Sequence, residues 1–508
     1  MRHYDVIVLG GNLASLFCGA VLAKRGFRIL LIGHDYLSPT YTVGEYRLPR
    51  LPFTFIGARS PITNRLLSEL RLTQPLRRLV SFPNPAFQFV LPGHRLDFFR
   101  DNAGLEKEIE REFPKVKRPI EDFHRNTTRI SKQLDSVLEK DLVWPPASFW
   151  ERREFARACA RHQSERAGQM HDLLAEFPED HPFRLAVHFP AYFSDGIGPD
   201  EITALRLSRH YVNWRQGSLA IEGGLTALHQ LLLDKIRSHS GAIQLNARAG
   251  SILVQRGVAC GIRLDGSDDE IGSNFVVAGI ELSDLLDLLP ERAEFEELFE
   301  RVGEPQRSHY RYALNLVVAA PGFPDAMKQN LFYLRNKRGP NTAENVLLIQ
   351  SERIDNRRFR ISLQALLPRR QIEDVEGYID TVRESLLESL RELLPFLDDH
   401  LLLVDSPNDG CVPRVDRGEG STPVEESWKR GPKTMSCTYA YPVTSALGLC
   451  AVPIYTPVRK LLLCNAQVAP GLGMEGLLLT AWSTARLITR SDPSKERMCK
   501  GLWTKVEI

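Results

Sequence analysis

Two short apolar runs flank one helical segment in the first 35 residues. The run at 4–10, YDVIVLG, is rich in β-branched residues and ends at glycine, which is typical of a buried parallel strand. From Leu13 to Lys24 small and apolar residues recur at helical spacing, and Gly26 is expected to end that helix. FRILLIG at 27–33 predicts a second buried strand. Strand, glycine turn, helix and strand in about thirty residues indicate the βαβ unit of a nucleotide-binding fold.

Later segments repeat this alternation of strand and helix patterns. Gly223 and Gly224 precede a segment whose leucines share one helical face, and three strand-like segments follow. KLLLC at 460–464 predicts another buried strand, which leads into a glycine turn and a helix. These segments therefore supply further strand-to-helix turns, whose free amides suit an anion or an electron-rich ring.

The segments between them predict a second unit with an antiparallel sheet. Residues 310–319 and 359–368 have strand patterns, and 380–397 predicts a helix with leucines three and four apart. Residues 104–161 have an amphipathic helical pattern interrupted by a turn at Trp144–Pro146, and 405–435 are expected to form a loop.

Length, charge and cysteine pattern limit the number of domains, the partners and the compartment that we expect for this protein. At 508 residues the chain is too long for one ordinary core, so two or three units are expected. The net charge of +2 argues against nucleic acid as a partner. Eight cysteines without a CxxC pair, and histidines without metal-ligand spacing, favour a reducing compartment and no metal site. Without an uninterrupted apolar run long enough to span a bilayer, we expect a cytoplasmic protein, with peripheral membrane contact left open and the oligomeric state unknown.

The turn VLGGNLASL at 8–16 departs from the usual glycine pattern of a dinucleotide site. Gly10 stands at the sharp turn, but Asn12 occupies the second glycine position, where backbone should approach a pyrophosphate. An asparagine there either crowds the pyrophosphate or donates its amide to it. Ser15, at the third position, is small enough for close packing, while the acidic residue expected after the second strand falls at Gly33, with Asp35 two positions on as its substitute. An empty Rossmann-like unit is the alternative.

Four further segments resemble the phytoene desaturase branch of the FAD-dependent amine oxidase and carotenoid desaturase superfamily. They are FTFIG at 53–57, the stretch LPGHRL to PIEDF at 91–123, the central stretch IEGGLTALHQ to NFVVAG at 221–279, and KLLLCNAQVAPGLGMEGLLLTAWSTARLI at 460–488. The last holds Pro470, Gly471, Gly473 and Gly476 in the Pro-Gly-x-Gly-x-x-Gly pattern of this family. The segments follow the family's order along the chain.

The resemblance implies a bound FAD and a set of residues around it. The family's Gly-Gly-Arg loop becomes Val43-Gly44-Glu45 here, with Arg47 nearby, and Asn465 replaces a usual glycine. The expected FAD-binding residues are Gly10, Gly11, Asn12, Leu13, Ser15, Asp35, Gly44, Arg47, Gly223, Gly224, Ala249, Asn465, Gly471, Gly473, Met474 and Gly476. Four aromatic residues, Phe189, Tyr192, Phe193 and Tyr211, lie where relatives build the substrate cavity.

The predicted fold is α/β, with a Rossmann-like FAD-binding domain and a discontinuous α+β substrate domain of antiparallel sheet plus helices. The expected segments are 1–85, 211–295 and 446–490 for the FAD-binding domain, 86–210 for a helical substrate or cap segment, 296–445 for the substrate domain and 491–508 for a tail.

The resemblance implies an FAD-dependent oxidoreductase that desaturates or isomerises a hydrophobic, polyprenoid or lipid-like small molecule. No carboxylate or histidine pair identifies a catalytic residue. Two alternatives remain: a scaffold or binding protein that binds FAD weakly or is not catalytic, and an amine oxidase on the same fold.

Overall fold

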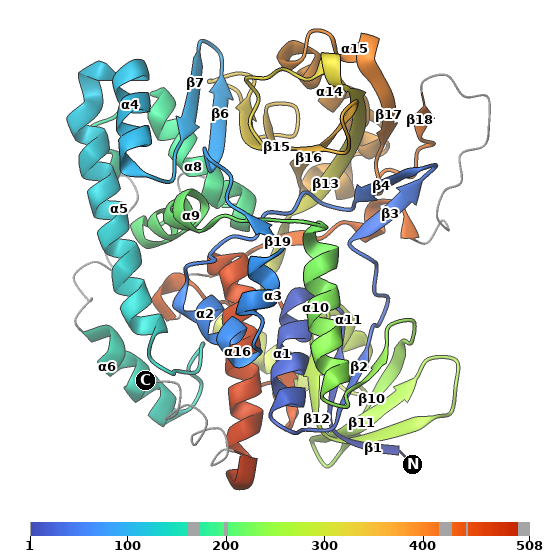
Figure 1. Cartoon of the computed structure of the whole chain (residues 1–508). Helices are drawn as coiled ribbons and strands as arrows, with labels where there is room; N and C mark the ends of the chain where they lie inside the picture. The colour runs from blue at the N-terminus through green and yellow to red at the C-terminus, as the bar shows by residue number, and fades with distance from the viewer. Residues whose placement is uncertain (1, 161–172, 198–201, 416–428, 443–445, 496–508) are drawn as a thin grey trace.

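The computed structural model describes residues 2–160, 173–197, 202–415, 429–442 and 446–495. Its core consists of two large sheets that lie one above the other in Figure 1, with helices packed around both. Among the residues described, no helix is both long and apolar enough to cross a membrane.

The lower sheet has seven strands and is parallel at its centre. Its order is β10-β11-β12-β1-β2-β9, with β20 also paired to β12. Strand β1 is parallel to both β12 and β2, whereas β10 and β11 form an antiparallel edge. The strands are β1 (Arg2–Leu9), β2 (Ile29–Ile32), β9 (Ala242–Gln244), β10 (Ala249–Gln255), β11 (Val258–Leu264), β12 (Glu270–Ala278) and β20 (Leu461–Leu463).

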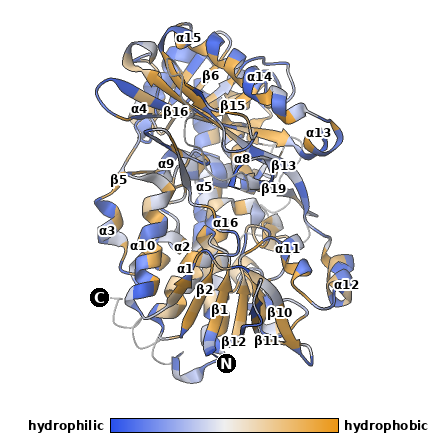
Figure 2. Cartoon of the chain, turned by 90° about the vertical axis from the view of Figure 1, so that its right-hand side faces the viewer, coloured by the Kyte–Doolittle hydropathy of each residue, from blue (hydrophilic) through white to orange (hydrophobic). Residues whose placement is uncertain are grey.

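Three helices cover one face of this sheet: α1 (Leu13–Lys24), α10 (Gly224–Ser238) and α16 (Met474–Arg490). Helix α1 lies between the other two, and every residue from Leu13 to Ala23 is buried. Because it is enclosed by the sheet and both neighbours, α1 is hydrophobic on all sides rather than on one. Figure 2 shows the strands beneath it as largely hydrophobic.

The upper sheet has nine strands and is antiparallel except for one pair. Its order is β18-β17-β13-β16-β15-β14-β6-β7, with β19 paired to β13, and only β14 and β6 run parallel. The strands are β6 (Phe87–Leu91), β7 (His94–Phe98), β13 (Gln306–Ala319), β14 (Asn330–Leu334), β15 (Val346–Arg353), β16 (Arg358–Pro368), β17 (Leu401–Asp405), β18 (Arg414–Val415) and β19 (Cys437–Ala440). Two small sheets pair β3 (Thr40–Val43) with β4 (Tyr46–Pro49) and β5 (Val80–Ser81) with β8 (Ala220–Ile221).

The remaining helices flank the two sheets. They are α2 (Pro61–Glu69), α3 (Thr73–Arg77), α4 (Asn102–Glu112), α5 (Lys117–Leu138), α6 (Phe149–Cys159), α8 (Pro182–Asp195), α9 (Ala204–Gly217), α11 (Leu282–Asp287), α12 (Ala293–Val302), α13 (Arg369–Asp374), α14 (Tyr378–Leu393) and α15 (Leu397–His400).

These sheets confirm the predicted fold class and correct some details. The expected strands at 310–319 and 359–368 are β13 and β16. The expected helix at 380–397 is α14, but it begins earlier and ends at Leu393. The helical segment from 104 is also broken before Pro114, a residue that cannot donate a backbone hydrogen bond.

The strands of each sheet come from several separate segments of the chain. The strands of the lower sheet fall within 1–85, 211–295 and 446–490, whereas the segment at 86–210, expected to be helical, also contributes β6 and β7 to the upper sheet. The domain boundaries themselves stay a prediction. Within the expected loop at 405–435, residues 416–428 lie outside the described residues, and the described part includes β18.

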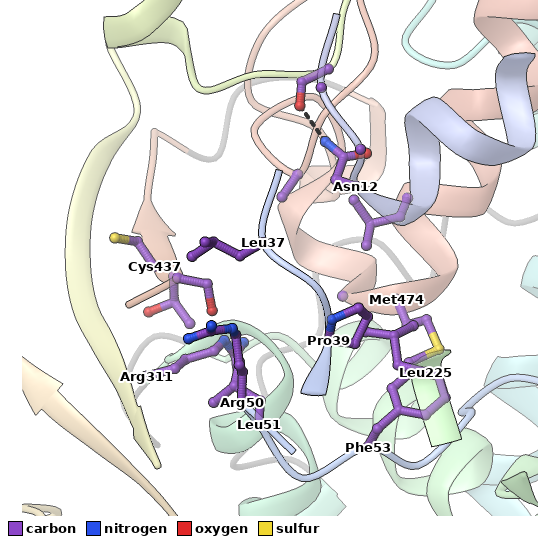
Figure 3. Close-up of a pocket in the computed structure, with 18 of the residues that line it drawn as sticks. Asn12, Leu37, Pro39, Arg50, Leu51, Phe53, Leu225, Arg311, Cys437 and Met474 are labelled. Carbon is purple, nitrogen blue, oxygen red and sulfur yellow. Dashed lines mark hydrogen bonds between the residues drawn. The ribbon is translucent and has the colours of Figure 1, made fainter. Parts of the chain in front are cut away.

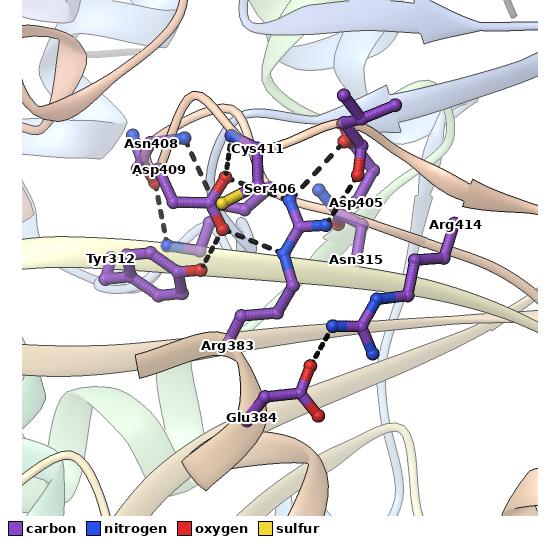
Figure 4. A network of polar contacts seen from close by, with 12 residues as sticks. Tyr312, Asn315, Arg383, Glu384, Asp405, Ser406, Asn408, Asp409, Cys411 and Arg414 are labelled. Carbon is purple, nitrogen blue, oxygen red and sulfur yellow. Dashed lines mark hydrogen bonds and ion pairs between the residues drawn. The ribbon is translucent and has the colours of Figure 1, made fainter. Parts of the chain in front are cut away.

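A buried ionic network holds the chain after β17 against the upper sheet (Figure 4). Arg383 of α14 donates to both oxygens of Asp409 at 2.9 Å, and the Tyr312 hydroxyl donates to the same carboxylate at 2.7 Å. Arg430 donates to Asp405 at 2.8 and 3.1 Å. Each buried charge therefore has a hydrogen-bonded partner of opposite sign, as burial of charges requires.

Candidate functional site

A cavity of about 770 Å³ runs from the carboxyl ends of β1 and β2 to the upper sheet. This volume is typical of small-molecule and cofactor sites, which span about 300–1,000 Å³. Figure 3 shows Phe53, Leu225 and Met474 gathered on one side, with Arg50, Arg311 and Cys437 on the other. The cavity thus joins an apolar wall to a cationic one.

The turn between β1 and α1 forms one end of the cavity, lined by Gly10, Gly11 and Asn12. Gly10 has φ +94°, and a Cβ there would lie 3.1 Å from the carbonyl carbon of Gly279. A Cβ on Gly11 would lie 2.2 Å from the Tyr36 ring, so neither glycine of this turn can carry a side chain without displacing its neighbours. Backbone amides at the start of α1, together with its positive dipole end, suit a pyrophosphate.

The Asn12 side chain forms two hydrogen bonds that stabilise this turn. Its Oδ1 accepts a hydrogen bond from the Ser15 amide at 2.9 Å and caps α1, while its Nδ2 donates to the Gly279 carbonyl (Figure 3). These two partners fix the orientation of the amide. A Cβ on Gly279 would collide with the Ser15 hydroxyl, so Ser15 serves close packing of α1 against the end of β12. Neither Ser15 nor Leu13 lines the cavity.

The segment after β2 explains why the acidic residue is displaced. A Cβ on Gly33 would lie only 1.9 Å from the Leu245 carbonyl oxygen, so no acidic side chain fits there. Asp35 does line the cavity, and its carboxylate forms an exposed ion pair with Arg248. The Ala249 amide donates to His34 Nδ1 at 3.2 Å, and Ala249 itself does not line the cavity.

The turn before α16 meets the middle of the cavity at Gly473 and Met474. Gly473 has φ +54° and ψ −126°, a conformation that is essentially restricted to glycine. Gly471 and Gly476 lie behind it: a Cβ on Gly476 would lie 2.0 Å from the Ala469 carbonyl oxygen, and the Gly471 carbonyl accepts from His210 at 3.2 Å. These two glycines therefore permit close packing behind the turn, and neither lines the cavity.

Buried ion pairs brace this turn. Asp195, which lines the cavity, accepts from Arg206 at 2.8 Å and lies 3.1 Å from His210 Nε2. Burial alone raises the pKa of Asp195, but Arg206 and His210 lower it below its usual value. Glu475, the second residue of α16, pairs with Arg209 of α9 at 2.7 Å, and its pKa is likewise low despite burial. Both carboxylates therefore remain ionised and fixed in position.

A half-buried arginine projects from the upper sheet into the cavity. Arg311 of β13 donates to the carbonyl oxygens of Phe193 and Ser194 at 2.6 and 2.9 Å. Burial lowers the pKa of Arg311 to about 10, so it is cationic at neutral pH. Cys437 lies near it, and burial raises the pKa of that thiol to about 12. This end therefore presents a fixed positive charge and a neutral thiol.

Several residues expected at the site do not reach the cavity. The β3–β4 hairpin, which carries Gly44 and Arg47, packs its apolar side chains against β13 and β17 instead. Gly223 and Gly224 have positive φ and begin α10, but Leu225 and His229 line the cavity in their place. Asn465 donates to the Ile280 carbonyl at 2.7 Å and supports the lining from behind.

Of the residues named from the sequence as FAD-binding, those that line the cavity are Gly10, Gly11, Asn12, Asp35, Gly473 and Met474. Of the four aromatic residues, Phe193 lines it, and Phe189, Tyr192 and Tyr211 belong to the apolar core beside the upper sheet. No local sequence pattern indicates Tyr36, Arg50 or Arg311, which only the tertiary fold brings together at the cavity. The two glycine turns and the cavity between them fit a dinucleotide.

Comparison with known proteins adds relatives for part of the chain. No protein-family model matches it. It is 27% identical over 291 residues to the chloroplastic prolycopene isomerase of Daucus carota, covering 54% of this chain and 46% of that protein. It is 21% identical over 291 residues to a 4,4'-diapophytoene desaturase (4,4'-diapolycopene-forming) of Methylomonas sp, covering 54% and 53%. The chain thus matches about half the length of these relatives.

Solved structures resemble almost the whole chain. An oxidoreductase from Methanosarcina mazei has a TM-score of 0.59 at 15% identity, covering 95% of this chain and all of that one. Wild-type putrescine oxidase bound to putrescine has a TM-score of 0.58 at 13% identity, covering 96% and 99%. At this identity the likeness concerns the fold.

Proposed function

Because the chain is phytoene desaturase-like in sequence and has the fold of FAD-dependent oxidoreductases, we propose that it is such an oxidoreductase, acting on a hydrophobic, polyprenoid or lipid-like substrate. The observation that carries this proposal is the single cavity that joins the α1 turn, the Gly473 turn and the upper sheet. A cofactor at the two turns would meet a substrate beside the sheet.

Each part of the cavity fits one part of FAD. The turn at Gly10 to Asn12 would hold the pyrophosphate through backbone amides, and Asp35 would accept from a ribose hydroxyl. The Gly473–Met474 turn would place the start of α16 against the electron-rich edge of the ring. FAD, when bound, supplies the hydride acceptor.

The chain's own residues would bind and orient the substrate and exclude water. Apolar side chains at Phe53, Leu225 and Leu348 line the cavity and suit a hydrocarbon, which has no group that forms hydrogen bonds. Desaturation removes a hydride from one carbon, which FAD would accept, and a proton from its neighbour, which would be released to solvent. Asp195 is held by Arg206 and His210, so its role is to brace the Gly473 turn rather than to accept that proton. Isomerisation, in contrast, leaves no net change in electrons.

The direct test supplies 4,4'-diapophytoene or prolycopene to FAD-loaded protein under anaerobic conditions. Bleaching of the flavin together with a longer polyene chromophore indicates desaturation, and a changed geometric isomer without net bleaching indicates isomerisation. No change in either carotenoid, with FAD bound, would refute the proposed substrate class.

The fold alone also permits an amine oxidase, and the test is putrescine in the same assay. Among the described residues the lining holds three arginines and four aspartates, so the assay rather than the charge of the cavity decides between the two substrates. A protein that binds no FAD and changes no substrate would instead be a scaffold on this fold.

A further inference from the structure

A second cavity, of about 1,140 Å³, lies among α4, α5 and the end of α9. Figure 1 shows α5 beside α4 on the left of the molecule, and α5 packs against α9. Trp214 lines the first cavity and the next residue, Arg215, lines the second. One turn of α9 therefore contributes to both cavities, although they share no lining residue.

Arg215 is a buried cation without an acidic partner among the described residues. It is 2% exposed, and its Nη1 donates a long hydrogen bond of 3.4 Å to Asn102 Oδ1. Its Nε is buried and has no hydrogen-bond partner. An unsatisfied buried donor of a charged group costs free energy, so a ligand that accepts from it is favoured.

His124 of α5 adds a second unsatisfied group to the same cavity. Its Nδ1 lies 3.1 Å from the Tyr211 hydroxyl, while its Nε2 is buried without a partner. Burial, with the charge of Arg215 nearby, holds the pKa of His124 well below its usual value, so the ring is neutral. In the tautomer in which the Tyr211 hydroxyl donates to Nδ1, Nε2 carries the proton and can donate to a ligand.

The rest of the lining is predominantly basic. Arg125, Arg129 and Lys132 lie along one face of α5, and Arg59 approaches from the segment before α2. Arg125 also forms an ion pair with Asp122 at 2.7 Å, which reduces its contribution to the positive charge of the cavity. Two carboxylates, Glu106 and Glu121, line the cavity as well. Basic groups therefore outnumber acidic ones, and the field inside favours an anion.

We propose that this second cavity binds the phosphate group of a phosphate-bearing molecule, with Arg215 and His124 donating to its oxygens. A phosphate offers several acceptor oxygens and up to two negative charges, which match a cluster of basic groups better than one carboxylate does. The cavity is much larger than a free ion, so the phosphate is carried by a larger molecule, either a soluble phosphate ester or an anionic lipid headgroup.

The test measures binding of inorganic phosphate and glycerol 3-phosphate to FAD-loaded protein by calorimetry, since bound FAD fills the pyrophosphate turn. The expected result is saturable binding that weakens at least tenfold in Arg215→Gln and severalfold in Lys132→Gln. Arg118→Gln is the matched control, because Arg118 is exposed on α5 and does not line the cavity. Absence of saturable binding, or equal losses in all three variants, would overturn the proposal.

Two further comparisons keep the test decisive. Should Arg215→Gln fail to fold, the phosphate affinities of Lys132→Gln and Arg118→Gln are compared instead. A loss in Lys132→Gln alone supports the proposal, and equal affinities overturn it. Vesicles of phosphatidate in phosphatidylcholine distinguish the sources: Lys132-dependent vesicle binding indicates a lipid headgroup, and binding of the soluble esters alone indicates a metabolite. Should the chain bind no FAD, the same titrations are made on the protein without FAD, and the variants at α5 and α9 still distinguish this site from the pyrophosphate turn.

Discussion

Replacing Asn12 separates its structural role from a direct role in binding phosphate. Asn12 caps α1 through Oδ1 and donates to the Gly279 carbonyl through Nδ2. Loss of an N-cap side chain costs about 1 kcal/mol in an alanine variant and only a few tenths in a glycine variant. Loss of the donor to Gly279 costs about 1 kcal/mol more. We therefore expect Asn12→Ala to be destabilised by about 2 kcal/mol, and Asn12→Gly by about half as much.

The assay pairs thermal unfolding with FAD titration of the apo-protein for Asn12→Gly, Asn12→Ala and Asn12→Asp. Asn12→Gly should keep its FAD affinity within a few fold, because the pyrophosphate is held by backbone amides. Asn12→Asp keeps the cap but places a carboxylate beside the Gly279 carbonyl and the pyrophosphate, so its affinity should fall at least tenfold. A tenfold loss of affinity in Asn12→Gly with unchanged stability would refute this reasoning and make the Asn12 amide a phosphate donor.

Three further predictions follow from the same structure. Gly473→Val should lose FAD because its φ of +54° excludes a β-branched residue, whereas Gly26→Ala, at φ +80° in open space, should keep it; equal flavin content in both would contradict this. Burial lowers the pKa of His229 to about 4, so the unfolded chain binds a proton that the folded chain does not between about pH 6.5 and 4. Stability should fall by up to about 3 kcal/mol as pH falls through that range, and His229→Gln should flatten this dependence in acid titrations of unfolding, while an unaltered slope would contradict it. Asp35→Asn should weaken FAD about fivefold with little change in stability, because its exposed ion pair with Arg248 contributes little; unchanged affinity in the titration would place the ribose elsewhere.

The sequence pattern was sufficient to predict many of the helices and strands, but not the tertiary contacts between them. The apolar runs at β1, β2, β13 and β16 were recognisable because their periodicity and length reflect burial on sheet faces. Glycine positions were less informative, because a sequence does not distinguish a glycine that faces a ligand from one that permits packing. Gly473 lines the cavity, whereas Gly476 leaves room for the Ala469 carbonyl.

Contacts between distant segments could not be predicted in this way. Arg311 reaches the cavity because β13 crosses it, and its partners at Phe193 and Ser194 lie more than a hundred residues away. The β6–β7 hairpin joins the upper sheet through a single parallel pairing with β14. Nothing local in either segment indicates these partners, since register and topology decide them.

The most direct test of the account is the absorbance spectrum of the purified chain after incubation with FAD and removal of free cofactor. The account predicts a yellow protein with flavin bands and about one FAD released per chain on denaturation. A folded, colourless protein that retains no FAD would contradict it and favour a scaffold on this fold.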